Sequence, residues 1–158
     1  MERKMYKPDR QLPVEEMKAL FEKGHHGTLS VNGDDGYPYG IPMDQWYCEE
    51  DGCLYFHCAK EGHKMDAIAR CDKVSFCVFD QGYRREGEWA LNIRSVIVFG
   101  RVQVLEDPEV SIAIVRKLGA KYTTDTEYIH KTVRQSAPNL RILRLTPEHI
   151  TGKLVNES

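Results

Sequence analysis

Six short stretches with the pattern of β-strands limit the folds that this chain can adopt. They lie at 28–31, 37–47, 54–58, 73–79, 93–105 and 140–146. Helical patterns are inserted between them, at 13–23, 65–71, 107–118 and 126–135. Strict strand–helix–strand alternation is absent, which argues against a doubly wound parallel sheet. The pattern predicts a mainly β fold with inserted helices, built as a small barrel of about six antiparallel strands.

Two prolines interrupt the second of these strands. Pro38 and Pro42 each lack a backbone N–H, which disfavours a regular central ladder and predicts an edge, a bulge or a ligand at that point. Residues 27–58 are expected to form a meander of three antiparallel strands. Gly100 interrupts the longest strand pattern, and it predicts a bend of the kind that small barrels need. A short tail is expected after residue 146.

The composition is that of one globular domain with no electrostatic preference for nucleic acid. The chain has 158 residues, with 22 Lys plus Arg, 24 Asp plus Glu and a formal net charge of -2, so neither nucleic acid nor a membrane surface is an expected partner. No apolar run approaches the ~20 residues that span a bilayer, and the first residues lack the apolar segment of a secretory signal. We expect a loose arm at 1–12, one domain at 13–158 and a cytoplasmic location with five reduced cysteines.

The densest cluster of functional side chains is YFHCAKEGHK, residues 55–64. It is predicted to be a strand that runs into a turn and then opens a helix. Backbone N–H groups at such a helix start, with Lys60, His63 and Lys64 beside them, form a potential binding site for a phosphate. Gly62 would let the backbone approach the anion closely. The alternative is a solvated turn with two exposed lysines, which composition alone favours because short basic turns are common.

The cysteines and histidines of this segment do not form a recognisable metal site or nucleophile. Cys53 and His57 share one face of their strand while Cys58 points to the other, so they do not converge on a metal. The paired spacings that are typical of zinc sites are absent as well. The same alternation separates His57 from Cys58, which argues against a catalytic Cys–His pair. No metal ion is expected.

Two further groups of residues have both a functional and a structural interpretation. Several aromatic side chains could line a site for a flat ring or could be core and interface residues, and the second is the commoner role of aromatics: Trp46, Tyr47, Tyr55, Phe56 and Trp89. Arg94 and Ser95, at the start of the long strand, could reach a ligand phosphate or could end the strand in water.

Three stretches and a short ending together resemble a known family. The segment GTLSVNGDDGYPYGIPM (27–43) is similar to the opening of the pyridoxamine-phosphate-oxidase-like flavoproteins, and LYFHCAKEGHKMDAI (54–68) resembles their I-Y-F-H-x-A-x-x-G-x-K signature. IRSVIVFGRVQVLED (93–107) resembles a later strand of the family, and ITGK (150–153) its usual ending. The resemblance covers about residues 13–153, and within the family it is nearest to the nitroimidazole-resistance (Nim-like) proteins.

This resemblance implies a flavin-reductase-like split β-barrel that forms a homodimer with FMN at the subunit interfaces. Carried over by position, Ile41, Pro42 and Met43 would line the flavin ring, and Tyr55, Phe56 and His57 would continue along its edge. The ribityl phosphate would be held by Ala59, Lys60, His63 and Lys64. Cys58, Arg94 and Ser95 complete the implied cofactor-binding set.

The function that the resemblance implies is an FMN-dependent oxidoreductase. It would reduce small molecules such as nitro-aromatic compounds of the 5-nitroimidazole type with electrons from NAD(P)H or another donor. His57 would be the catalytic residue, as a proton donor to the reduced substrate. Two alternatives remain open at this point: a flavin- or haem-binding protein without turnover, and a pyridoxamine 5'-phosphate oxidase proper.

Overall fold

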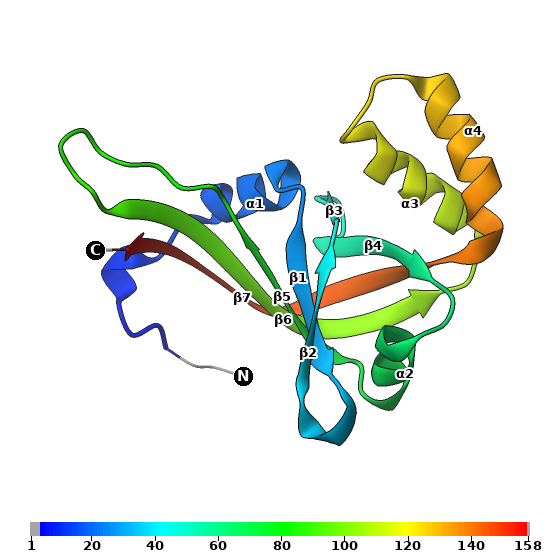
Figure 1. The fold of residues 1–158 in the computed structure, drawn as a ribbon, viewed down its shortest axis with the longest axis horizontal. Coiled ribbons are helices and arrows are strands. Elements are labelled where there is room, and N and C mark those ends of the chain that lie inside the picture. Colours follow the sequence, from blue (N-terminus) through cyan, green and yellow to red (C-terminus); the bar gives the residue numbers. More distant parts are fainter. Residues whose placement is uncertain (1–3, 158) are drawn as a thin grey trace.

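The predicted strands fold into one antiparallel sheet in the computed structural model, which describes residues 4–157 (Figure 1). The strands are β1 (Gly27–Asn32), β2 (Pro38–Met43), β3 (Trp46–Cys48), β4 (Cys53–Ala59), β5 (Lys73–Phe79), β6 (Leu91–Leu105) and β7 (Leu140–Glu157). The helices are α1 (Val14–Lys23), α2 (His63–Arg70), α3 (Pro108–Ala120) and α4 (Thr126–Ser136), with 3-10 turns at Pro8–Arg10, Asp34–Gly36 and Ala137–Asn139. The expected class, mainly β with inserted helices, is confirmed.

The order of the strands differs from the expected one. The sheet runs β2-β1-β5-β6-β7-β4-β3, so the meander of three strands predicted over 27–58 is wrong. β1 pairs with β2 and β5, whereas β3 pairs with β4 at the other edge of the sheet. Within the described residues no ladder joins the two edges, so the barrel stays open.

The strand predicted at 37–47 is divided, which gives seven strands instead of about six. The division falls at residues 44 and 45, between β2 and β3. The side chain of Gln45 is fully buried there, and its Nε2 donates to the carbonyl oxygens of Phe21 and Gly24. Because this amide is fixed to the end of α1, the chain turns away from the edge that β2 had formed.

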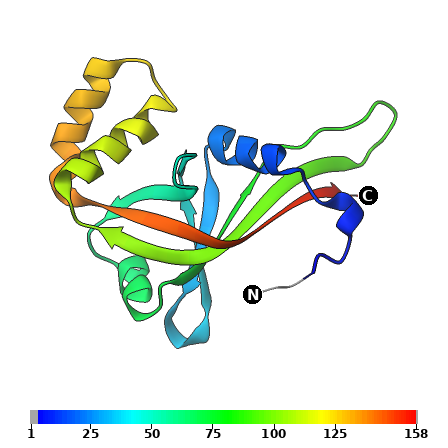
Figure 2. The same ribbon diagram turned by 180° about the vertical axis from the view of Figure 1, so that it is seen from behind.

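The two longest strands, β6 and β7, run side by side through the molecule (Figure 2). Their register shifts between Phe99 and Gly100, which confirms the predicted bend. A Cβ at Gly100 would lie 2.2 Å from the carbonyl oxygen of Thr146, so a side chain does not fit at this point. The last strand continues to Glu157 rather than ending at residue 146, because β6 supplies pairing partners along this whole length.

The sheet has two hydrophobic cores, and β4 contributes to both. Leu54 and Phe56 point into the larger core, which α1 and α2 cover. Cys53 and Tyr55 point the other way, into a smaller core that contains Ile114 of α3. The alternation of β4 therefore decides which residues face the α3–α4 side of the molecule.

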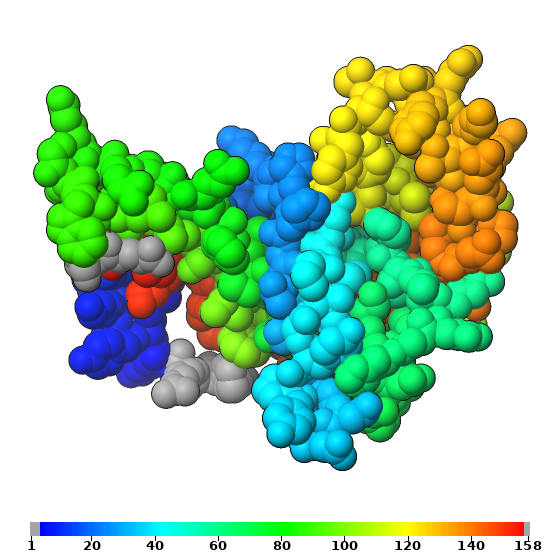
Figure 3. All heavy atoms as spheres, viewed as in Figure 1, coloured from blue at the N-terminus to red at the C-terminus, as the bar shows by residue number. Residues whose placement is uncertain are grey.

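Helices α3 and α4 form a pair at one end of the molecule, and the loop between β5 and β6 projects at the other (Figure 3). Each helix begins at an aspartate whose side chain accepts backbone N–H bonds: Asp107 from Glu109 and Val110, and Asp125 from Tyr128. Such caps satisfy donors that the helix itself cannot pair. They fix the start of both helices over the smaller core.

The end of the expected N-terminal arm is attached to the sheet. Gln11 forms a bridge with Lys153, and the N–H of the buried Leu12 donates to the carbonyl of Gly152. Residues 1–3 of the arm lie outside the described part of the chain. None of the helices within residues 4–157 has the length and apolar content to cross a membrane.

Candidate functional site

The turn between β4 and α2 carries two positive charges without a partner. Gly62 precedes the helix with a φ of 117°, a conformation that favours glycine, and no described side chain caps the helix. Lys60 is exposed and Lys64 is half-buried. In residues 4–157 no salt bridge joins either lysine to a carboxylate. Free N–H groups and two uncompensated cations together favour a bound anion.

Two open strand edges meet at this turn. β2 is an edge strand that pairs only with β1. β3 pairs with β4 only over residues 53–55, so within residues 4–157 the edge of β4 on the β3 side has no strand partner from residue 56 to residue 59. Lys64 connects the two, because its Nζ lies 3.5 Å from Sδ of Met43 at the end of β2. Unpaired backbone groups on both strands are therefore available to hydrogen-bond a ligand.

Several of the predicted ring-lining side chains lie inside the protein. Met43 and Phe56 are buried in the larger core, and the ring of Phe56 packs edge-on against that of Phe76 with the ring centroids 4.9 Å apart. Tyr55 is buried on the other face, where its hydroxyl donates to Asp51 at 2.6 Å. A ligand at the open edges would meet only the backbone of these residues. Ile41 is half-buried against the core, whereas Pro42, His57 and Ala59 are exposed.

His63 is held against the β1–β2 hairpin. Its ring stacks on Tyr39 with centroids 4.2 Å apart and an interplanar angle of 10°. Its Nε2 lies 3.4 Å from Asp34, which Arg70 also binds at 2.6 Å. These contacts attach both ends of α2 to the hairpin and thereby position the first turn of the helix. The stacking of Tyr39 on His63 could not be foreseen from the sequence, because it joins two elements that are separate along the chain.

Cys58 is a core residue. Its thiol is buried and lies 3.7 Å from Sδ of Met65. Burial raises the pKa of this thiol, and the nearby charges of Lys64 and Arg141 only partly oppose the effect. The thiol is therefore protonated near neutral pH, which does not suit a nucleophile. Within residues 4–157 no group of His, Cys, Asp and Glu side chains is arranged to hold a metal ion.

Arg94 and Ser95 are not brought together with the lysines. They lie near the start of β6, whereas α2 lies at the opposite end of this strand (Figure 1). Arg94 is bound by Glu16 at 2.8 Å and by Asp80 at 3.2 Å. The hydroxyl of Ser95 donates to the carbonyl of Lys153 at 3.4 Å. Within a single chain, Arg94 and Ser95 therefore have a structural role: their bonds hold together the end of the sheet next to α1.

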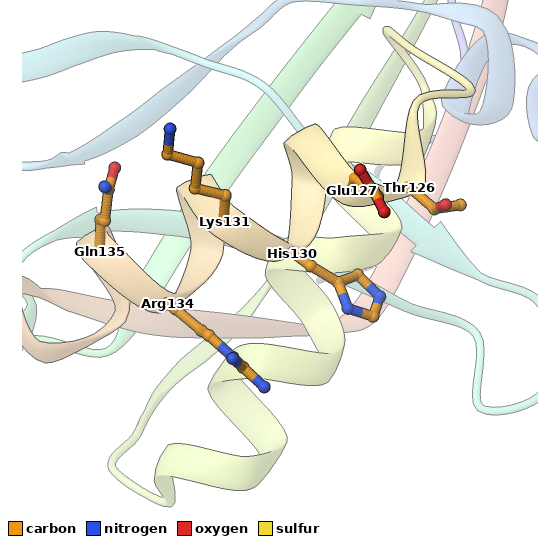
Figure 4. Close-up of a pocket in the computed structure, with 6 residues that line it drawn as sticks. All are labelled: Thr126, Glu127, His130, Lys131, Arg134 and Gln135. Carbon is orange, nitrogen blue, oxygen red and sulfur yellow. The ribbon is translucent and has the colours of Figure 1, made fainter.

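His57 faces a cavity on the α3–α4 side of β4. The cavity has a volume of about 240 Å³, and Asp44 and residues of both helices line it. A larger hollow of about 540 Å³ lies on α4. Figure 4 shows that its six lining residues all come from this one helix and that their side chains splay apart. Because nothing converges there, the cavity at His57 is the better candidate for a binding site.

Lys121 is a residue that the sequence did not indicate. Its Nζ donates to Asp44 at 2.9 Å and to the carbonyl of Gly24 at 3.0 Å, and it also donates to the carbonyl of Gln45. These bonds attach the end of α3 to the bend between β2 and β3. Lys121 and Asp44 are 77 positions apart, so no local pattern could have paired them.

Comparisons with known proteins identify a family through one family model and a fold through solved structures. A family model described as pyridoxamine 5'-phosphate oxidase matches residues 13–154. A candidate 5-nitroimidazole antibiotic resistance protein from Bacteroides thetaiotaomicron aligns with a TM-score of 0.76 at 19% identity, covering 91% of this chain and 85% of that chain. No curated protein sequence matches the chain.

Two other solved structures have the same architecture. A conserved hypothetical protein from Mycobacterium tuberculosis aligns with a TM-score of 0.81 at 19% identity, over 96% of this chain and 90% of that chain. A FAD-binding protein from Mesorhizobium loti aligns with a TM-score of 0.65 at 22% identity, over 92% and 97%. At such identities these structures establish a shared fold only.

Proposed function

Because the chain belongs to the pyridoxamine 5'-phosphate oxidase family, we propose that it is a flavin-binding oxidoreductase of the split-barrel fold with FMN as its cofactor. Its proposed substrates are small molecules such as nitro-aromatic compounds of the 5-nitroimidazole type, and its proposed electron donor is a nicotinamide. The observation that carries the proposal is the pair of uncompensated lysines, Lys60 and Lys64, beside the uncapped start of α2. Similarity to a candidate 5-nitroimidazole resistance protein and to a FAD-binding protein supports it.

The residues at the turn fit a ligand that ends in a phosphate. A phosphate monoester carries a charge of about -1.5 to -2 near neutral pH, and Lys60, Lys64 and the N–H groups of α2 would neutralise and hydrogen-bond it. The open backbone edges of β2 and β4 would hydrogen-bond the polar rim of a flat ring. A bound flavin supplies the electron transfer. The protein would supply orientation and charge neutralisation.

His57 is the proposed proton donor. Its side chain is exposed on β4, in the part of the strand where the edge is open, and it reaches the cavity under α3 and α4. Imidazole can both donate and accept a proton, as the reduction of a small substrate requires. His57→Ala should lower turnover while FMN affinity stays within about twofold of the parent, since the phosphate seat is untouched.

We also propose that the chain works as a homodimer in the cytoplasm, with FMN near the interface. Large apolar side chains such as Phe79 (60% exposed) and Trp89 (75% exposed) stand at the end of the molecule that carries the loop after β5. A second copy would cover such surface; FMN lies near the interface if this end of one copy packs against the α2 end of the other. Light scattering during gel filtration tests this, and a monomer at micromolar concentration would refute it.

FMN binding by charge variants tests the phosphate seat. We expect the double variant Lys60→Ala, Lys64→Ala to bind FMN about 10- to 100-fold more weakly. Lys60 is exposed, so solvent screening reduces its contribution to the binding free energy. The measurement is a titration that follows quenching of flavin fluorescence. Lys131→Ala, which removes an exposed lysine from α4, is the matched control. Equal affinity of the double variant and the control would contradict the assignment.

A second experiment separates the candidate functions. The FMN-loaded protein is mixed with NADPH or NADH without oxygen, and a nitroimidazole is then added. Bleaching followed by reoxidation with loss of the nitro group supports the proposed oxidoreductase. Bleaching without turnover would indicate a flavin-binding protein, and peroxide formation with pyridoxine phosphate would indicate an oxidase. A haem Soret band in place of flavin absorption would overturn the choice of cofactor.

A further inference from the structure

The cavity between β4 and the α3–α4 pair has the character of a ligand pocket. Its walls are almost wholly apolar, and their apolar members come from both helices: Val115, Leu118, Gly119, Ile129 and Val133. The polar lining residues include His57 of β4, Thr123, Thr132 and two tyrosines, Tyr122 and Tyr128. A few placed polar groups in an apolar wall are typical of sites for small molecules.

Apart from His57, the charged groups at the pocket are already paired with each other. Asp44 is the carboxylate among the lining residues, and Lys121 binds it at 2.9 Å. The side chains of Asp44 and Lys121 are only 13% and 12% exposed. Lys121 also donates hydrogen bonds to the carbonyls of Gly24 and Gln45. Neither charge is free to pair with a ligand, and placing an unpaired charged ligand among apolar walls would be costly.

The size of the pocket favours a ligand of one ring. Its volume is about 240 Å³, whereas sites for drug-sized ligands span about 300–1,000 Å³. A single ring therefore suits it better than the three fused rings and ribityl chain of a flavin. We place the cofactor and the ligand of this pocket at different points, with His57 bordering both.

We propose that this pocket binds a neutral, single-ring molecule that carries one hydrogen-bonding group directed at His57. The apolar walls of α3 and α4 enclose the ring, and the imidazole of His57 hydrogen-bonds the substituent. The proposal rests on the proposed function in one respect: the bound ring would be the molecule that is reduced. Binding itself requires no flavin, so the two can be tested separately.

The test uses the full-length protein and phenol as the probe. Methyl NMR of Ile129 and Val133 reports occupancy, since both residues line the pocket. We expect saturable shifts of these methyl groups with phenol and at least tenfold weaker binding of benzoate, which has the same ring with a charge. Shifts that do not saturate, or that are equal for benzoate, would overturn the proposal.

Matched variants locate the probe. Val115→Phe fills the pocket from α3, and Thr132→Phe fills it from an exposed position on α4, so that the second variant serves if the first does not fold. Val110→Phe, on the exposed start of α3, is the control. Phenol shifts should vanish in a folded pocket variant and persist in the control. Persistence in both filled variants would refute the assignment.

FMN affinity measured on the same samples distinguishes the two proposals. If FMN binds and phenol does not shift the Ile129 and Val133 methyl groups, the pocket assignment fails while the cofactor assignment stands. If phenol binds and FMN does not, the pocket stands and the proposed function fails.

Discussion

Removing the ammonium group of Lys121 should destabilise the fold strongly. In Lys121→Met the apolar stem remains, but Asp44 keeps a carboxylate that is only 13% exposed and loses its bond from Lys121, as does the carbonyl of Gln45. The carbonyl of Gly24 keeps only its bond from Nε2 of Gln45. Breaking a buried ion pair by removing one partner costs about 3–5 kcal/mol. Because some solvent still reaches this pair, we expect a value at the lower end, about 3 kcal/mol.

Urea unfolding followed by circular dichroism measures the effect. With a slope of about 2 kcal/mol per molar urea, a loss of about 3 kcal/mol lowers the midpoint by about 1.5 M. Lys117→Met, on the exposed side of the same helix, is the control and should change the free energy of unfolding by less than about 0.5 kcal/mol. Adding Asp44→Asn to Lys121→Met should recover part of the loss, since no uncompensated charge remains. A midpoint for Lys121→Met equal to that of the control would refute this reasoning.

Three other results are expected. Gly100→Ala should lower the free energy of unfolding by about 3 kcal/mol in urea titrations, because the new Cβ would lie 2.2 Å from the Thr146 carbonyl oxygen; a change below about 0.5 kcal/mol would contradict the bulge geometry. Burial raises the pKa of Asp51, but hydrogen bonds from Tyr55 and a backbone N–H outweigh it and hold the pKa below its usual value. This carboxylate therefore stabilises the fold at neutral pH and ceases to do so as the pH falls through its pKa, so acid titrations of stability should be less steep in Tyr55→Phe than in the parent. Burial raises the pKa of the Cys58 thiol, so iodoacetamide at pH 8 should alkylate it far more slowly in the folded than in the unfolded protein, and equal rates would exclude the buried thiol.

Features that depend on neighbouring residues were predictable from the sequence. The alternation at 73–79 predicted β5 with its observed ends, and the helical pattern after Pro13 predicted α1. The segment around Gly62 was also predicted as a strand, a turn and a helix start, because a glycine between a strand and a basic helix start is a local signal. The proposed anion site rests on that local order, which is why it could be proposed before the fold was known.

Features that depend on distant residues were not predictable. β1 pairs with β2 and with β5, and β3, β4 and α2 lie between these two partners along the chain. The strand order could therefore not be predicted by pairing strands that are adjacent in the sequence. The break between β2 and β3 depends on Gln45, whose amide binds carbonyl groups at the end of α1. The alternation placed Tyr55 and Phe56 on opposite faces, but only the packing of the helices shows that both faces are buried. Their side chains are therefore core residues, although the family resemblance placed them at the ring.

The alternation of β4 connects the two proposed sites, whose chemistry is independent. Phe56 is locked in the larger core and Tyr55 in the smaller one, so a shift of one residue would exchange their environments. This packing fixes His57 on the α3–α4 side, while the end of the same strand delivers Lys60 to the start of α2. Substitutions in the α3–α4 wall should therefore change which molecule reaches His57 without changing the affinity for a phosphate. Substitutions at the lysines should have the opposite effect, so that in this proposal the choice of substrate can vary while the proposed cofactor site stays the same.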